Sequence, residues 1–192
     1  MATGCSRDSK VSSTAPAHPA PSRASDAAPI DPLRLGLDGV GPLRSGMPID
    51  REELVGLLPG YTVVVTEDSF EGQSFEVWEI RSGDATVVRL VPSDGVIGAL
   101  TVLSSAIASD TGVAVGTGYA EVRDRIGPLT CELTYHDDMF PVQPTCTASR
   151  APGWNIVFAP VDAEGLGEGQ PVPPDRQQKL LAGAVVEAID FR

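Results

Sequence analysis

Turn-forming residues recur at short intervals in the first half of the chain, and their spacing restricts the fold more than any other feature. Gly72, Gly83 and Gly95, each beside an acidic residue, separate runs that are rich in β-branched residues. Short turns of this composition are typical of β-hairpins, and they leave no room for long helices. We therefore expect an antiparallel meander whose strands cover residues 61–66, 74–81, 85–91 and 96–103.

The second half of the chain follows a similar plan, and each half begins with a short helix. Leu54 and Leu58 are four residues apart, as are Val122 and Ile126, which is helical spacing. A Pro/Gly pair follows each helix and ends it. The expected helices cover 49–58, 119–127 and 176–181, and the later strands cover 130–135, 145–149, 155–159 and 185–191. The sequence thus predicts an α+β fold, antiparallel and β-rich, in which a pseudo-repeated helix-plus-meander unit occurs twice within one domain, residues 33–192.

Residues 1–32 have a composition that does not support a hydrophobic core. They contain no aromatic residue, and Ala, Ser and Pro fill 18 of the 32 positions. Such a segment buries too little apolar surface to offset the entropy that it would lose on ordering. We expect a disordered tether, with an end-to-end distance of roughly 30 Å between Cys5 and Pro32 for a random coil.

The tether begins with a candidate lipid-attachment site. Ala2-Thr3-Gly4-Cys5 resembles the end of a bacterial lipobox, in which small residues precede the cysteine that is acylated. We expect Cys5 to carry the lipid that holds the chain on a membrane, and stable anchoring requires more than one acyl chain. A free thiol at Cys5 is the alternative.

The charge of the chain excludes one class of partner. The formal net charge is −12, from 26 acidic and 14 basic residues, and all of it falls on residues 33–192 because the charges of the tether cancel. Nucleic-acid phosphate repels such a surface, and nucleic-acid binders usually carry a basic patch. We expect no nucleic-acid partner.

Cys131 and Cys146 fit one hairpin register. If the hairpin is centred between Asp138 and Met139, residues whose numbers sum to 277 lie opposite each other, and 131 and 146 have this sum. Opposite positions bring two thiols near disulfide distance. The sequence predicts a structural disulfide, with two unrelated buried thiols as the alternative. The spacing of the cysteines does not match a zinc motif, and we expect no metal.

The chain contains no motif of a known catalytic site, and we expect no catalytic residue and no cofactor. The Gly-rich stretch 112–118 lacks the lysine of a phosphate-binding loop. His136-Asp137-Asp138 is a compact polar group, but it lies at a predicted hairpin tip, where Asp is a common turn residue. An enzyme or small-ligand binder that uses acidic side chains is one alternative function. Its candidate residues are Asp84, Asp94, Asp110, Asp137 and Asp138.

Several short stretches carry a resemblance to a known family. They are Asp94-Gly95-x-Ile97, Val102-Leu103-Ser104, Ile107, Asp110-Thr111-Gly112-Val113-x-Val115-Gly116-Thr117, and the pair Cys131 and Cys146. On these residues, mainly over 94–192, the chain resembles the uncharacterised sigma-E (envelope-stress)-regulated lipoproteins of the bacterial cell envelope. The resemblance implies a lipid-anchored periplasmic domain, and it transfers no catalytic residue.

A second motif implies a protein-binding role. Gly46-Met47, followed by Glu52-Glu53-Leu54, is similar to a pattern of small periplasmic modules, among them β-lactamase inhibitors and small lipoproteins of outer-membrane assembly. Inhibition of a periplasmic hydrolase is therefore another alternative function. Our main expectation is a lipoprotein of the outer membrane, whose periplasmic, non-catalytic domain binds an envelope protein or serves the envelope under stress.

Overall fold

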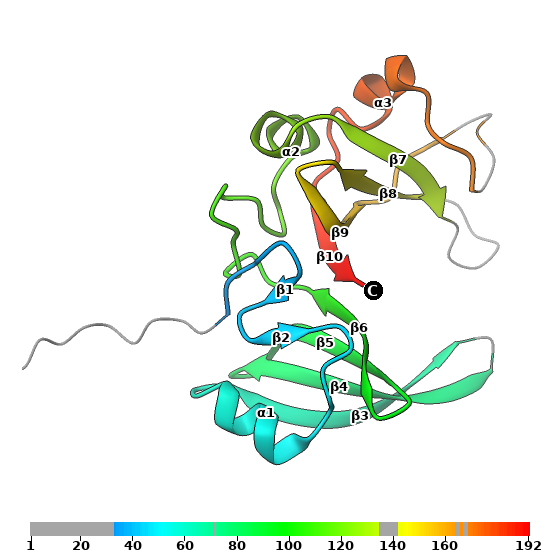
Figure 1. Ribbon diagram of the computed structural model, residues 1–192. Helices are drawn as coiled ribbons and strands as arrows, with labels where there is room; N and C mark the ends of the chain where they lie inside the picture. Colours follow the sequence, from blue (N-terminus) through cyan, green and yellow to red (C-terminus); the bar gives the residue numbers. More distant parts are fainter. Residues whose placement is uncertain (1–32, 71, 135–141, 164–165, 167–168) are drawn as a thin grey trace, which may run out of the picture. The chain divides into compact units, whose positions relative to one another are not determined.

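Eight antiparallel strands form one continuous sheet in the computed structural model of the protein, which describes residues 33–70, 72–134, 142–163, 166 and 169–192 (Figure 1). The strands lie in the order β3-β4-β5-β6-β10-β9-β8-β7. Their bounds are Thr62–Phe70 (β3), Gln73–Ser82 (β4), Ala85–Ser93 (β5), Val96–Val102 (β6), Leu129–Thr134 (β7), Gln143–Ala148 (β8), Ala151–Phe158 (β9) and Val186–Phe191 (β10). The predicted α+β, antiparallel and β-rich class is confirmed.

The turn between β5 and β6 shows why an Asp-Gly pair in the sequence predicts a hairpin. Ser93 pairs with Val96, so the connection has two residues, Asp94 and Gly95. Both have positive φ, 50° and 80°, as a type I′ hairpin turn requires. Aspartate and glycine tolerate this conformation better than most residues, which explains their place at the turn.

One departure from the predicted strand bounds is at β3. This strand continues to Phe70, beyond the expected end at residue 66, and pairs with β4 along its whole length. β5 pairs with β4 only as far as Trp78, so the outer parts of β3 and β4 form a two-stranded arm. Because no third strand pairs with this arm, its residues need not alternate between apolar and polar. The alternation from which the strand bounds were predicted is therefore absent there.

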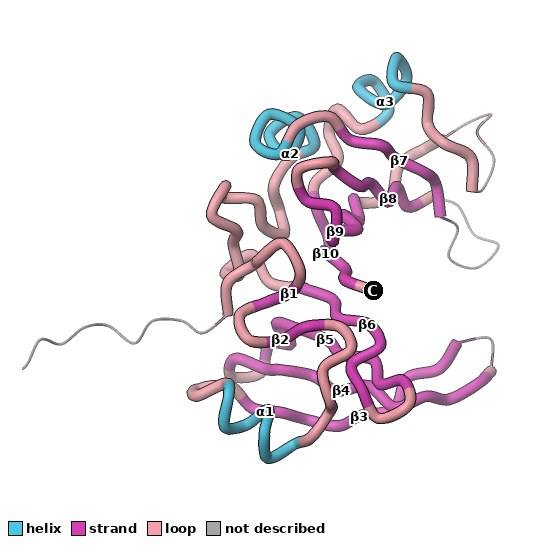
Figure 2. The backbone as a smooth tube through the Cα atoms, in the orientation of Figure 1, coloured by secondary structure: helices cyan, strands magenta, loops and turns pink. Residues whose placement is uncertain are grey.

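Three short helices and a two-stranded ribbon complete the described part of the chain (Figure 2). The helices are Arg51–Leu57 (α1), Tyr119–Ile126 (α2) and Pro174–Leu180 (α3), and the ribbon consists of Gly39–Val40 (β1) and Leu43–Arg44 (β2). The Asp50 side chain caps α1 by accepting a hydrogen bond from the backbone N–H of Glu53 at 2.9 Å. Gly127, with a φ of 91°, ends α2.

Two four-stranded meanders meet where β6 pairs with β10. In each half a helix precedes the strands, α1 before β3 to β6 and α2 before β7 to β10. The halves differ in that α3 lies between β9 and β10, whereas a two-residue turn joins β5 to β6. The internal repeat itself stays a prediction of the sequence. The pairs that join the meanders are Val102 with Ile189, Thr101 with Asp190, and Leu100 with Phe191.

One row of buried side chains crosses the entire sheet. Its members are partners in successive strand pairs, so they lie on the same face, and each is at most 2% exposed. Because side chains alternate between the faces of a strand, the row defines the face on which the core lies. From edge to edge the row is Val63, Ile80, Val88, Val102, Ile189, Ile156, Cys146 and Cys131.

The elements outside the sheet cover this face. Leu54 of α1, Val40 of β1, Leu43 of β2, and Val122 and Ile126 of α2 all belong to the same buried cluster as the row. Burial of a leucine or valine side chain contributes about 1.5–3 kcal/mol, so this contact area holds the helices and the ribbon on the sheet.

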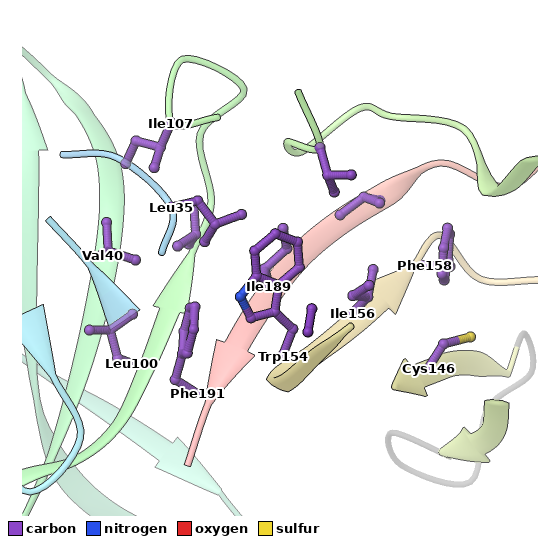
Figure 3. Close-up of a cluster of buried hydrophobic side chains, with 14 of the residues drawn as sticks. Leu35, Val40, Leu100, Ile107, Cys146, Trp154, Ile156, Phe158, Ile189 and Phe191 are labelled. Atoms are coloured by element: carbon purple, nitrogen blue, oxygen red, sulfur yellow. The ribbon is translucent and has the colours of Figure 1, made fainter. Parts of the chain in front are cut away.

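The segment before β1 packs closely on β9. Figure 3 shows Trp154 among the buried side chains of β9, β10 and this segment, including Leu35. The Trp154 indole N–H donates a hydrogen bond to the Gly36 carbonyl oxygen at 2.7 Å. A Cβ atom on Gly153 would lie 2.4 Å from the Leu37 carbonyl oxygen, so glycine is required at this crossing.

The outer edge of β7 is covered by a later segment of the chain. Gly169 and Val172 donate backbone hydrogen bonds to the carbonyl oxygens of Leu133 and Cys131, at 2.9 and 2.8 Å. Pairing of this kind shields an edge strand from uncontrolled association. The predicted tether and the predicted hairpin tip with His136, Asp137 and Asp138 lie outside the residues that the structure describes.

The crossing at Gly153 can be tested by substitution. Gly153→Ala should lower the free energy of unfolding by about 1–3 kcal/mol, because the new methyl group forces the Leu37 backbone away from β9. Urea denaturation followed by circular dichroism measures this change. Gly183→Ala is the matched control, since a Cβ there meets no atom within 4 Å, and it should change stability by less than about 0.5 kcal/mol. Equal stability of the two variants would contradict the close packing.

Candidate binding groove

A row of polar side chains lies on the face of the sheet opposite the core. Each of its members precedes or follows a member of the buried row along its strand, so it points to the other face. Successive pairing connects the row from β4 to β9 through both meanders. Its members are Glu79, Arg89, Thr101, Asp190 and Asn155.

This face is hollowed into a groove of about 680 Å³, to which the six strands from β5 to β10 contribute side chains. The volume falls within the range of about 300–1,000 Å³ that is usual for ligand pockets. The charged side chains that line it are Arg89, Glu132, Glu187, Asp190 and Arg192. Its neutral polar side chains are Thr101, Thr134, Gln143, Thr145 and Asn155.

Some groups of the groove are already connected by hydrogen bonds. The Gln143 side-chain amide donates to a carboxylate oxygen of Glu187 at 2.9 Å. The hydroxyl groups of Thr134 and Thr145 are 3.5 Å apart. These contacts link β8 to β10 and β7 to β8, and they orient the polar side chains toward the groove.

A cluster of charges on β4 and β5 borders the groove at Arg89. Glu79, only 9% exposed, accepts hydrogen bonds from Nε of Arg81 at 2.8 Å and from the hydroxyl of Thr86 at 3.1 Å. The hydrogen bond from Arg81 is the main reason that the pKa of Glu79 lies below its ordinary value of 4.5, although burial acts in the opposite direction. Glu79 therefore remains ionised at neutral pH and is unsuited to donate a proton.

Arg89 is held in place by two carboxylates. Its Nη1 lies 3.0 Å from Oδ2 of Asp68, and its Nη2 lies 4.0 Å from Oε1 of Glu79. The buried Nε of Arg89, by contrast, has no hydrogen-bond partner among the described residues. The two ion pairs fix the guanidinium group at the end of the groove, where its exposed part faces the lining.

The groove can bind a polar ligand through hydrogen bonds and charge. Hydroxyl and amide groups both donate and accept hydrogen bonds, and the carboxylates and guanidinium groups add charge-assisted ones. Within the described ranges, no group of three or more His, Cys, Asp and Glu side chains is arranged to hold a metal ion. None of the described helices is both long and apolar enough to cross a bilayer.

The acidic residues proposed from the sequence do not converge in the described structure. Asp84 and Asp94 flank β5 at its two ends, roughly 30 Å apart for an extended strand. Asp110 forms an ion pair of 2.8 Å with Arg34, and its side chain is 92% exposed. The remaining candidates, Asp137 and Asp138, lie outside the described residues.

The acidic side chains that do line the groove are not among the residues predicted from the sequence. Glu132 stands between Cys131 and Leu133, and Asp190 stands between Ile189 and Phe191. An acidic residue between two buried apolar residues of a strand must face the opposite side of the sheet, and this alternation was the available signal.

The predicted cysteine register is confirmed. All six residue pairs between β7 and β8 sum to 277, and Cys131 lies directly opposite Cys146. The two residues form a disulfide with their Cα atoms 4.0 Å apart. Because Glu132 and Thr145 are their neighbours along the strands, the disulfide lies behind one end of the groove.

Comparisons with known proteins identify a fold and no function. No family model matches the chain, and no curated protein matches it. The crystal structure of the uncharacterized protein yfeY from Escherichia coli is similar, with a TM-score of 0.57, 22% sequence identity, and coverage of 83% of this chain and 99% of that one. At this identity the likeness shows the fold alone.

The Glu79 cluster leads to a prediction about stability and pH. Glu79→Gln should lower the free energy of unfolding by about 1–3 kcal/mol at pH 7, because two arginines lose a carboxylate partner. Since the pKa of Glu79 is lowered in the folded state, its contribution is complete above pH 4.5 and is lost as the pH falls through the folded value. The difference between wild type and variant should therefore shrink in acid.

Urea denaturation at a series of pH values measures this difference. Glu52→Gln, at an exposed site in the first turn of α1, is the control and should have an effect of less than about 0.5 kcal/mol. A difference in the free energy of unfolding between wild type and Glu79→Gln that stays constant from pH 7 to well below 4.5 would refute the lowered pKa of Glu79.

Proposed function

We propose that the protein is a lipoprotein of the bacterial cell envelope, anchored through Cys5 to the outer membrane, with a non-catalytic periplasmic domain that binds another envelope protein. The role that best fits the family resemblance is one in envelope homeostasis under stress. The hydrolase-inhibitor alternative and the acidic-enzyme alternative stay predictions of the sequence.

The disulfide between Cys131 and Cys146 is the observation that carries this proposal. Disulfides persist in oxidising compartments such as the periplasm and are rare in the reducing cytosol. This one closes a loop with a sequence separation of 15 residues, for which the entropic model gives a stabilisation of about 3 kcal/mol. Both cysteines are buried members of the row that crosses the sheet. The disulfide is therefore part of the core and does not join two exposed thiols.

The open face of the sheet supports a binding role. The groove presents charged and neutral polar groups from six strands of a continuous sheet, which is a rigid support for recognition. The acid nearest to the groove with a shifted pKa is Glu79, and its pKa is shifted downward. A general acid at neutral pH needs the opposite shift, so Glu79 itself is not suited to acid catalysis.

A second candidate function, binding of a small polar ligand, is favoured by the size of the groove. A volume of about 680 Å³ is sufficient for a drug-sized molecule. Its lining combines polar side chains with the apolar side chains of Leu103, Val157 and Ala188, whereas most small-molecule pockets are predominantly apolar.

The anchor and the disulfide can be tested together on the natural gene. The gene, with its upstream region, is expressed in a related bacterium, and the intact mass of the purified protein is measured after alkylation with and without reductant. We expect a mass that matches a triacylated N-terminal Cys5, no alkylation of the oxidised protein, and two alkylated thiols after reduction. Cys5→Ser is the control and should abolish the lipid while it leaves the disulfide intact. A protein that retains Met1 and has three free thiols would overturn the proposal.

A further inference from the structure

The two outer edges of the eight-stranded sheet, at β3 and β7, differ in how the described chain covers them (Figure 1). At β7, backbone N–H groups of Gly169 and Val172 bond to the strand, whereas no described residue outside the sheet makes a backbone–backbone hydrogen bond to residues 62–70 of β3. Proteins usually protect an open edge with lysine, proline or a β-bulge. β3 contains neither lysine nor proline, and its nine pairs with β4 are unbroken. The β3 edge is therefore open to a further strand.

Two hydrogen bonds show which backbone groups of β3 point outward. Nη2 of Arg51, on α1, donates to the carbonyl oxygen of Val63 at 3.4 Å, and the N–H of Ser69 donates to the preceding aspartate side chain at 2.8 Å. Backbone groups alternate in direction along an antiparallel edge strand. Val65 and Glu67 therefore point away from β4 as well. No described residue outside the sheet bonds to their backbone, so two N–H and two C=O groups are available there.

The side chains along this edge indicate the chemistry of a partner strand. Val65 pairs with Trp78 and is 41% exposed. Glu67 pairs with Glu76 on the same face, and both are exposed. Like charges directly opposite each other destabilise a pair of strands. The Trp78 indole N–H donates to Glu76 at 2.6 Å, but no described arginine or lysine forms an ion pair with either glutamate. A basic side chain beside Glu67 would relieve this repulsion.

The arm formed by β3 and β4 would gain stability from a third strand. β5 pairs with β4 only as far as Trp78, so Glu67 and Glu76 lie in the two-stranded part. A two-stranded ribbon is marginally stable by itself. A strand added to the β3 edge would supply backbone hydrogen bonds and cover the exposed side of Val65.

A second copy of the chain is poorly suited to this edge. The charged residues of β3 are Glu67 and Asp68, both acidic. Antiparallel pairing of two β3 strands centred on Glu67 places two glutamates opposite each other, and pairing centred on Thr66 places Val65 opposite Glu67. In neither register does a basic side chain of the second β3 reach Glu67 and Glu76. The net charge of −12 adds repulsion between copies. The charge of the edge therefore favours a strand from another protein.

We propose that the β3 edge binds an extended segment of another protein as an additional antiparallel strand. The segment carries lysine or arginine opposite Glu67 and an apolar residue opposite Val65, and in the antiparallel direction the basic residue comes two positions before the apolar one. Backbone hydrogen bonds supply affinity, and the alternate side chains supply specificity. The inference rests on the protein-binding part of the proposed function, and it names the surface and the chemistry of the partner.

A capped peptide of seven residues tests the inference on the folded full-length chain. In acetyl-Val-Thr-Thr-Lys-Thr-Val-Thr-amide the lysine is designed to lie opposite Glu67 and the second valine opposite Val65. Titrations followed by backbone amide NMR shifts give the affinity and the location of binding. We expect the largest shifts at Val65 and Glu67. Replacement of the lysine by glutamine should weaken binding by about threefold, as expected for an exposed ion pair.

Methylation of peptide nitrogens tests the backbone hydrogen bonds. Methyl groups on the amides of the lysine and the second valine remove the two N–H groups that should face β3, and binding should weaken by about tenfold or more. Methyl groups on the second and third threonines, whose N–H groups should point away from β3, are the matched control. These should change the affinity by less than about twofold.

A variant of the protein tests the charge at the edge. Glu67→Gln should abolish the preference for the lysine peptide over the glutamine peptide, because the acidic partner of the lysine is removed. Glu132→Gln changes an acidic residue on β7, at the opposite edge of the sheet, and is the matched control. It should leave the preference at about threefold.

Three results would overturn the inference. The first is the absence of shifts on β3 at about 10 mM peptide, a concentration at which even weak binding is visible. The second is equal affinity for the two methylated peptides. The third is a dimer in sedimentation whose formation shifts the amide signals of Val65 and Glu67, because a second copy would then occupy the edge. None of these results affects the lipid anchor or the disulfide, which are read from the mass of the natural protein.

Discussion

The pairing of β6 with β10 is the interaction on which the rest of the structure depends. It consists of three residue pairs, and it joins two four-stranded meanders into one sheet of eight strands. Without it, each meander would end at an exposed strand edge, which is a site for uncontrolled association. The pairing also places Ile189 opposite Val102 in the buried row and Asp190 opposite Thr101 in the polar row. The core and the candidate groove are therefore continuous across the same junction.

The register of that pairing determines both faces at once. Side chains alternate along a strand, so a slip of one residue would turn Ile189 toward the groove and Asp190 toward the core. The cost of burying an unpaired carboxylate makes such a slip strongly unfavourable. At the far edge the disulfide fixes the register of β7 against β8 in the same way, and Glu132, beside Cys131, is thereby directed into the groove. The side chains that line the groove thus have directions that the core already determines.

Local signals in the sequence were sufficient to predict much of the fold. These signals each involve residues that are close in the chain. They are the Asp94-Gly95 turn, the helical spacing of Leu54 and Leu58, and the hairpin register that places Cys131 opposite Cys146. The order of the strands was not predictable in this way, because β6 and β10 are separated by more than 80 residues and no local pattern specifies their pairing. The groove depends on that order. Alternation along each strand could have placed Glu132 and Asp190 on the face opposite the core, but it does not bring β7 and β10 into one groove, and the acids chosen instead were turn residues such as Asp84.

The most direct test asks whether the β6–β10 pairing makes the two meanders one cooperative unit. Trp78 lies in β4 and Trp154 in β9, so Trp154→Phe leaves a fluorescent reporter in the first meander and Trp78→Phe leaves one in the second. Each variant is unfolded in urea, and its fluorescence is compared with its own far-ultraviolet circular dichroism. Coincident transitions in both variants are the result that one continuous sheet predicts. A fluorescence transition at a urea concentration different from that of the circular dichroism, in either variant, would show that the meanders unfold separately and would contradict the account.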